Sequence, residues 1–170
     1  MHGTLIVVTG APGAGKTTLA RALATELQVA LLAKDDVKEA LFDALGAGDR
    51  AWSQRLGGAT YDVLFAVATR LLESGVDCIL ESNFTNAEPL RRLPAARTVQ
   101  LFCSAPADVV LRRYAQRERH PGHLDDVIVD ELRVRLHAEE WRPLELDGET
   151  IVVDTERAVD VPTLARRLRR

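Results

Sequence analysis

The stretch Gly10-Ala11-Pro12-Gly13-Ala14-Gly15-Lys16-Thr17 matches the pattern G-x-x-x-x-G-K-[ST] at every fixed position. Its glycines can adopt backbone angles that are closed to other residues, so successive N–H groups can turn inward around an anion. Lys16 adds a positive charge that can reach the outer phosphates of a nucleotide, and the Thr17 hydroxyl is a typical ligand of phosphate-bound Mg²⁺. The motif therefore predicts a phosphate-binding loop at the start of a helix, whose positive end faces the same phosphates.

The residues on either side of this loop supply the context that the motif requires. Residues 4–9 form a continuous apolar and β-branched run, which is typical of a buried parallel strand. Apolar residues recur at helical spacing after the loop, at Leu19, Ala20, Leu23, Ala24 and Leu27. Strand, glycine loop and helix follow in the expected order, and we expect the loop, extended to Thr18, to bind a nucleoside triphosphate.

Length and composition predict one globular domain over residues 1–170. No apolar run approaches the roughly 20 residues that span a bilayer, so we expect no membrane partner. The first strand begins directly after residues 1–3, so we expect no signal peptide and a cytoplasmic location. The net charge of −3 gives no basic field that would mark nucleic acid as the partner. Cys78 and Cys103 lie in apolar strand-like runs, and we interpret them as buried, reduced side chains.

Strand and helix patterns alternate along the chain, which predicts an α/β fold with a parallel sheet covered by helices on both faces. Four further strands are expected at residues 29–33, 77–81, 98–103 and 149–154. Helical patterns are expected at residues 37–45, 51–73, 88–93, 106–120, 125–140 and 161–170.

Polar residues follow three of these strands, at positions 35–36, 81–83 and 155–156. Because ligands of a parallel sheet bind at the carboxyl ends of its strands, these residues are candidates for the site. Glu81 ends an apolar strand where an acidic residue can meet the Mg²⁺ shell through water, and Asn83 is placed to hold an acceptor substrate. Either residue could instead cap a loop.

The two aspartates after the second strand need separate roles. Asp36 and Glu39 have capping-box spacing, so we expect Asp36 to cap the helix and Asp35 to face the site. A carboxylate beside the terminal phosphate can accept the proton of a hydroxyl group, and we predict Asp35 as that general base. The alternative is that Asp35 caps the helix and Asp36 is solvated.

Basic residues gather before the Pro121-Gly122 break. Arg113 and Arg117 are four residues apart, so we expect them on one face of a helix within a mobile lid of residues 113–126. Such arginines can stabilise a transferring phosphoryl group, although a solvated helix face is the alternative. His120 and His123 flank the break, and we expect a lid turn or substrate contact there rather than a metal site.

With these residues placed, the chain resembles the P-loop kinase superfamily, and within it the polynucleotide kinase-like, zeta-toxin-like and chloramphenicol phosphotransferase-like enzymes. The resemblance rests on the loop, residues 34–38, residues 81–83 and the lid arginines. It implies a P-loop NTPase fold with strand order 2-3-1-4-5, ATP as donor, Mg²⁺ as cofactor and Asp35 as general base. Polynucleotide kinases carry an arginine where this chain has Lys38, which keeps the charge but loses bidentate phosphate recognition.

The leading hypothesis is an ATP-dependent kinase that phosphorylates a hydroxyl group of a small molecule. Asp35 would deprotonate the acceptor, which Lys38, Glu81 and Asn83 would help to bind. Lys16, Arg113, Arg117 and Mg²⁺ held by Thr17 would stabilise the transferring phosphoryl group.

Two alternatives remain open at this point. A nucleic-acid 5′ hydroxyl is the second candidate acceptor, favoured by the basic lid and by the arginine run at residues 166–170. A nucleotide-dependent binding module or ATPase without an acceptor is the third hypothesis. The chain lacks the Asn/Thr-Lys-x-Asp motif after a late strand that a GTPase needs.

Overall fold

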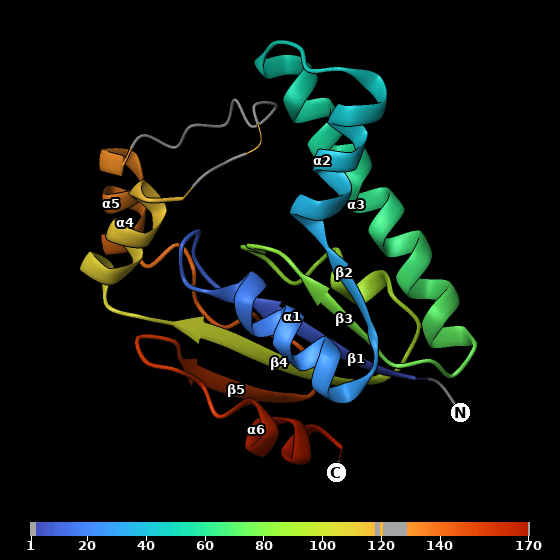
Figure 1. Cartoon of the computed structure of the whole chain (residues 1–170). Helices are drawn as coiled ribbons and strands as arrows, with labels where there is room; N and C mark the ends of the chain where they lie inside the picture. The colour runs from blue at the N-terminus through green and yellow to red at the C-terminus, as the bar shows by residue number, and fades with distance from the viewer. Residues whose placement is uncertain (1–2, 118–119, 121–128, 170) are drawn as a thin grey trace.

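The strand β1 (Thr4–Thr9) lies at the centre of a sheet with helices on both faces, as the computed structural model shows for residues 3–117, 120 and 129–169 (Figure 1). Leu5 and Val7 pack into a hydrophobic cluster on one face, and Ile6 and Val8 pack into a second cluster on the other. Both sets of alternating side chains are therefore buried, which explains why β1 is apolar throughout instead of alternating with polar residues.

Five strands form the sheet: β1, β2 (Ala30–Ala33), β3 (Cys78–Glu81), β4 (Arg97–Ser104) and β5 (Glu149–Asp154). All neighbouring pairs are parallel, and the spatial order is β2-β3-β1-β4-β5, which confirms the predicted fold. In this register Val8 lies opposite Glu81. The carboxyl ends of β1 and β3 therefore lie next to each other, and the phosphate loop starts beside Glu81.

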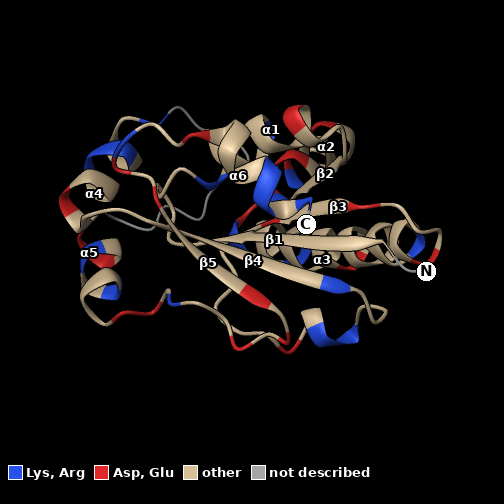
Figure 2. Ribbon diagram, turned by 90° about the horizontal axis from the view of Figure 1, so that it is seen from below, with Lys and Arg blue, Asp and Glu red and all other residues tan. Residues whose placement is uncertain are grey.

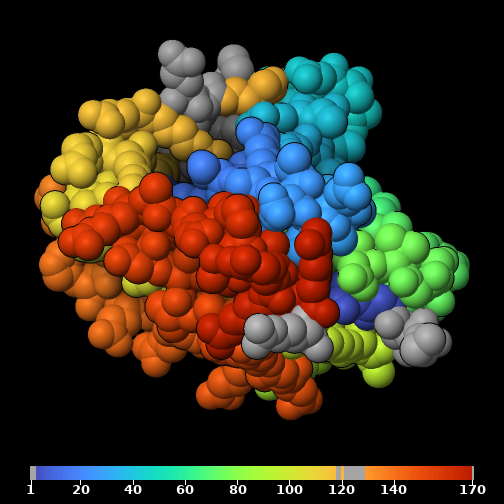
Figure 3. Space-filling model, turned by 60° about the horizontal axis from the view of Figure 1, so that its bottom comes forward, coloured from blue at the N-terminus to red at the C-terminus, as the bar shows by residue number. Residues whose placement is uncertain are grey.

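The helices are α1 (Lys16–Leu27), α2 (Lys34–Leu45), α3 (Arg50–Glu73), α4 (Ala107–Ala115), α5 (Val129–His137) and α6 (Val161–Leu168), with a 3₁₀ turn η1 (Leu90–Arg92). Helices α1, α4, α5 and α6 contribute to the cluster on one face, and α3 with η1 contributes to the cluster on the other. Helix α6 packs beside α1, as the red and blue surfaces in Figure 3 show.

In Figure 1, α4 and α5 lie on one side of the phosphate loop, and α2 with the start of α3 lies on the other. Acidic and basic residues are interspersed over the ribbon in Figure 2, in keeping with the small net charge. None of the helices described here is long and apolar enough to cross a membrane.

The capping prediction for the second helix is wrong. Helix α2 begins at Lys34, and its N-cap, Ala33, offers no side-chain hydrogen bond. Asp35 and Asp36 therefore both lie in the first turn, where their charges favour the positive end of the helix. Asp36 has no capping role and instead pairs with Arg21 of α1 at 2.8 Å.

One other local prediction needs correction. Helix α4 ends at Ala115, so Arg117 lies beyond it and does not share a helical face with Arg113. Helix α3 runs without interruption through Gly57 and Gly58. Of the predicted lid, residues 118, 119 and 121–126 lie outside the described residues, and so does His123.

Candidate active site

The phosphate loop depends on glycine for steric reasons that the structure makes explicit. Gly10 and Gly13 have φ angles of 142° and 85°, in the range that other residues rarely adopt. A Cβ atom on Gly10 would lie 2.5 Å from the carbonyl oxygen of Cys103, and one on Gly13 would lie 2.7 Å from that of Val110. The loop is therefore pressed against β4 and α4, and only glycine fits at these two positions.

Lys16 is buried inside this loop. Its ammonium group donates a hydrogen bond to the carbonyl oxygen of Ala11 at 2.8 Å, so the side chain folds back over the loop that precedes it. Burial lowers the pKa of Lys16, while the nearby carboxylates of Glu81 and Asp35 act in the opposite direction. The lysine, the β3 carboxylate and the α2 carboxylate are thus close enough to interact electrostatically.

Glu81 lies directly beside the start of α1. The Thr17 hydroxyl donates to a carboxylate oxygen of Glu81 at 3.3 Å. Glu81 is 4% exposed, and burial raises its pKa, with the charge of Lys16 opposing this rise. A hydroxyl and a carboxylate are oxygen ligands that suit Mg²⁺, which takes few ligands from the protein and the rest from phosphates and water. In the described part of the chain no three His, Cys, Asp or Glu residues cluster as a metal site.

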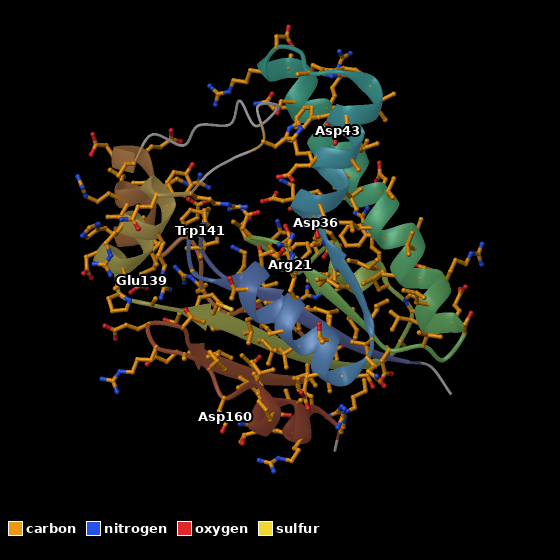
Figure 4. The ribbon with its side chains drawn as sticks, in the orientation of Figure 1. Arg21, Asp36, Asp43, Glu139, Trp141 and Asp160 are labelled. Carbon is orange, nitrogen blue, oxygen red and sulfur yellow. The ribbon has the colours of Figure 1, made fainter. Side chains whose placement is uncertain are left out.

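The two aspartates of α2 point to different surroundings. One carboxylate oxygen of Asp35 lies 3.2 Å from Arg117, and the other lies 3.5 Å from Lys34. Asp36 pairs with Arg21 on the outside, where both side chains are largely exposed; Figure 4 labels this pair beside α1 and α2. The structure therefore brings Asp35, and not Asp36, towards Lys16 and Glu81.

A second set of polar side chains, on α2 and α3, lies near Lys16, Glu81 and Asp35. Lys38 is 1% exposed, its ammonium group donates to the Ser53 hydroxyl at 3.0 Å, and it lies 5.4 Å from the centre of the Phe42 ring. Further along α3, the Tyr61 hydroxyl and the Ser82 hydroxyl are 2.8 Å apart.

Tyr61 and Ser82 connect this group to β3 and to the residue predicted to hold the acceptor. The Ser82 hydroxyl also lies 3.4 Å from the side-chain oxygen of Asn83. Burial raises the pKa of Tyr61, and the charges of Asp35 and Glu81 contribute to the rise. Tyr61 therefore lies near Asp35 and Glu81, and the sequence analysis did not single it out.

Ser53 was missed as well, although the sequence held a signal for it. Ser53 and Thr60 lie on the buried stripe of α3, and small polar residues at such positions are unusual in a helix that packs on a core. Tyr61, in contrast, has no such signal, because a tyrosine beside an apolar stripe is ordinary core composition.

Arg113 and Arg117 contact different segments: Arg117 contacts Asp35 of α2, and Arg113 contacts the segment after β5. Arg113 donates hydrogen bonds to the carbonyl oxygens of Thr155 and Glu156 at 2.9 and 3.2 Å, and it lies beside Gly15. It lines a cavity of about 490 Å³ that also contacts Thr18 and the segment after β5. This cavity adjoins the phosphate loop and has the size that a nucleotide base requires.

His120 contacts α2. Its ring stacks on Phe42 with centroids 5.8 Å apart, and its Nε2 lies 3.1 Å from a carboxylate oxygen of Asp43. His120 therefore contacts α2, the helix that carries Asp35 and Lys38. Among the described residues it belongs to no cluster of metal-binding side chains.

Comparison with known proteins places this geometry in a family. A family model described as an AAA domain matches residues 5–138. The chain belongs to this AAA-domain family. An adenylyl-sulfate kinase from Chloroflexus aurantiacus is 39% identical over 118 residues, which are 65% of this chain and 61% of that protein. The chain therefore covers less than two thirds of that relative's length. A guanylate kinase from Methylobacillus flagellatus is 28% identical over 168 residues, covering 77% of this chain and 83% of that protein.

Solved structures of kinases share the fold of this chain. A candidate kinase from Chloroflexus aurantiacus j-10-fl has a TM-score of 0.88 and 37% identity, with 99% of this chain and 98% of that chain covered. A shikimate kinase from Bacteroides thetaiotaomicron shares the fold, with a TM-score of 0.58 and 23% identity over 98% of this chain and 96% of that one. The predicted P-loop kinase fold and the resemblance to that superfamily are confirmed.

Proposed function

We propose that this AAA domain is an ATP-dependent kinase that transfers the γ-phosphate of ATP to a hydroxyl group of a small molecule. The observation that carries the proposal is the proximity of Lys16, Glu81 and Asp35 at the carboxyl ends of three neighbouring strands, β1, β3 and β2. The similarity to an adenylyl-sulfate kinase and to a candidate kinase supports the same reaction class.

The donor side consists of the phosphate loop and the cavity beside Gly15. Main-chain N–H groups of residues 10–18, apart from Pro12, would hold the phosphates, and the cavity lined by Arg113 would hold the base. Thr17 and Glu81 supply oxygen ligands that fit Mg²⁺, which offsets phosphate charge when it is bound. Both the Mg²⁺ shell and acceptor binding were predicted for Glu81, and the hydrogen bond from Thr17 supports the first of these roles.

On the acceptor side, Asp35 is proposed as the general base. It would take the hydroxyl proton as the acceptor oxygen forms its bond to the γ-phosphorus and the bond from that phosphorus to the bridging oxygen of ADP breaks. Lys16 and Arg117 would stabilise the charge on the transferring group. Arg117 already lies against Asp35, so it can reach the same space.

The acceptor would lie against Lys38, Ser53, Tyr61, Ser82 and Asn83. Four of these residues offer hydroxyl or amide groups, and Lys38 offers a buried positive charge. We infer an acceptor that is small and rich in hydrogen-bonding groups, because the side chains around it offer hydroxyl, amide and ammonium groups.

The proposal is tested by transfer of labelled γ-phosphate to a panel of acceptors. The panel contains adenylyl sulfate, shikimate, sugars, nucleosides and 5′-hydroxyl oligonucleotides, and Lys16→Ala serves as the blank. Stimulation by a small hydroxyl compound supports the proposal. Transfer to oligonucleotides alone would show a polynucleotide kinase instead, and ATP hydrolysis that no acceptor changes would show an ATPase or nucleotide-dependent module.

A further inference from the structure

Three side chains form a hydrogen-bond relay between helix α3 and the loop after β3. The Tyr61 hydroxyl, on α3, lies 2.8 Å from the Ser82 hydroxyl, and the Ser82 hydroxyl donates to the side-chain oxygen of Asn83 at 3.4 Å. Ser82 is 2% exposed, whereas Asn83 is partly exposed. The relay therefore runs from the interior to the surface, and it ends two residues after Glu81.

The number of hydroxyl protons gives this relay a direction. Burial raises the pKa of Tyr61, so its hydroxyl keeps a proton at neutral pH. Among the residues that the structure describes, the hydrogen-bond partner of this hydroxyl is Ser82. A hydroxyl proton that is shielded from water costs stability when it has no acceptor, so Tyr61 donates and Ser82 accepts. The single proton of Ser82 is then donated to Asn83, which matches the second bond.

This direction determines which end of the Asn83 amide faces the relay. Its side-chain oxygen accepts from Ser82, so its N–H₂ group is turned away from Ser82 and keeps two protons to donate. In the described part of the chain, neither proton is taken by an acceptor. Asn83 therefore offers two hydrogen-bond donors at a partly exposed position.

The Tyr61 end of the relay is held by aromatic packing. The Tyr61 ring packs on the rings of Phe65 and Phe84, with centroids 5.9 and 5.7 Å apart. These contacts restrain the ring, so the hydroxyl of Tyr61 has a fixed position relative to Ser82.

The Asn83 end of the relay is held by β1. The Ser82 N–H donates to the carbonyl oxygen of Val8 at 3.2 Å, and the Thr9 hydroxyl donates to that of Phe84 at 3.4 Å. Both neighbours of Asn83 in the sequence are thus attached to the last two residues of β1, which directly precede the phosphate loop. Asn83 lies beside the start of that loop, where the acceptor would meet the nucleotide.

We propose that Tyr61 is a positioning residue, which acts through Ser82 to hold the Asn83 amide ready to donate to the acceptor substrate. The inference rests on the proposed kinase function and narrows its substrate class. The acceptor carries an oxygen that accepts hydrogen bonds, from a carbonyl, carboxylate or phosphoryl group, near the hydroxyl that is phosphorylated.

The direction of the relay is tested in the free protein, without nucleotide or acceptor. Neutron diffraction from crystals of the perdeuterated full chain locates the deuterium atoms on Tyr61, Ser82 and Asn83. We expect the deuterium of Tyr61 to point to Ser82, that of Ser82 to point to Asn83, and both amide deuterium atoms of Asn83 to point elsewhere. An Asn83 amide whose nitrogen donates to Ser82 would overturn the proposal.

Variants of the first two residues test the effect on the acceptor, with the compound that the labelled-phosphate panel identifies. Tyr61→Phe keeps the ring and removes only the hydroxyl, so the KM for the acceptor should rise about fivefold while kcat and the KM for ATP change less than about twofold. Ser82→Ala should act in the same way and replaces the first variant if that one does not fold. Ser82→Thr restores the hydroxyl and should recover most of the affinity. An acceptor KM that neither removal changes would overturn the proposal.

Asn83→Asp tests the substrate class. An aspartate can still accept from Ser82 but has no proton to donate at neutral pH, so the KM for the acceptor should rise about tenfold or more. An equal or lower KM would show that the acceptor presents a donor at this position and would overturn the inference. If the wild type phosphorylates no compound of the panel, the proposed function fails, and the neutron structure alone then decides the direction of the relay.

Discussion

Arg117 places a guanidinium nitrogen 3.2 Å from a carboxylate oxygen of Asp35, although the two residues are 82 positions apart in the chain. The pair joins the segment after α4 to the first turn of α2. In the proposed reaction the same arginine stabilises the phosphoryl group while the same carboxylate receives a proton. The ion pair must therefore loosen when both substrates are bound.

This pair predicts a specific effect of removing Arg117. In Arg117→Met, kcat should fall by roughly 10²-fold because charge on the transferring group is no longer stabilised. Folding stability should change little, because an ion pair with side chains 35% and 29% exposed contributes little. Steady-state kinetics and thermal melts check the two effects. Arg112→Met, on the exposed side of α4, is the control and should keep the wild-type kcat.

Glu81 predicts a pH dependence of stability. Burial raises the pKa of Glu81 in the folded state, so its charged form costs stability at neutral pH. The wild type should gain stability relative to Glu81→Gln as pH falls through the folded pKa, until it passes below the ordinary value for glutamate. Melting temperatures of both proteins without Mg²⁺, measured from neutral to acidic pH, test this. If the melting temperature of the wild type instead fell relative to that of Glu81→Gln on acidification, the assignment would be contradicted.

Glu81→Gln, which should stabilise the fold at neutral pH, should weaken the activity. Glu81→Gln removes a charged oxygen ligand beside Thr17, so the Mg²⁺ concentration that gives half-maximal activity should rise. A variant that is more stable at neutral pH and needs more Mg²⁺ separates the metal role from a structural role of this side chain.

Gly13 and Gly58 form a matched pair for substitution by alanine. Gly13→Ala puts a Cβ 2.7 Å from the Val110 carbonyl oxygen at a φ of 85°, and it should cost about 1–3 kcal/mol of unfolding free energy and weaken ATP binding. Gly58→Ala meets nothing within 4 Å inside α3 and should stabilise the protein by about 1 kcal/mol. Urea unfolding and ATP titration measure both; equal effects at the two positions would be inconsistent with a steric role for Gly13.

Substitution of Lys38 is expected to change the affinity for the acceptor and not the affinity for ATP. In Lys38→Met, the KM for the acceptor should rise about tenfold or more, because a buried charged hydrogen bond to the substrate is lost. The KM for ATP is the internal control and should stay unchanged, since Lys38 lies on α2 and not on the phosphate loop. A rise in the ATP value of the same size would place Lys38 on the donor side.

The donor side of the site could be predicted from sequence because it depends on local pattern. The glycines, Lys16 and Thr17 follow one another in one stretch, and the alternation of strands and helices determines the sheet around them. The acceptor side depends on how α2 and α3 pack together. No local pattern specifies that Tyr61 meets Ser82 or that Lys38 meets Ser53.

The wrong predictions share one physical cause, which is the position of a helix end. Capping-box spacing around Asp36 is real in the sequence, but α2 starts three residues before the predicted start at residue 37, at Lys34. The four-residue spacing of Arg113 and Arg117 is also real, but α4 ends between them, at Ala115. Spacing rules hold only within a helix, and terminal residues are the least certain part of any helix assigned from pattern.

The role of Asp35 is tested most directly by single-turnover phosphoryl transfer in Asp35→Asn, with Asp36→Asn as the matched control. Asp35→Asn should lower the transfer rate by about 10²–10⁴-fold and leave the Kd for ATP unchanged, because it removes the proton acceptor but not the phosphate loop. Asp36→Asn, which only loses an exposed pair with Arg21, should transfer at the wild-type rate. Transfer by Asp35→Asn at the wild-type rate would contradict the proposed mechanism.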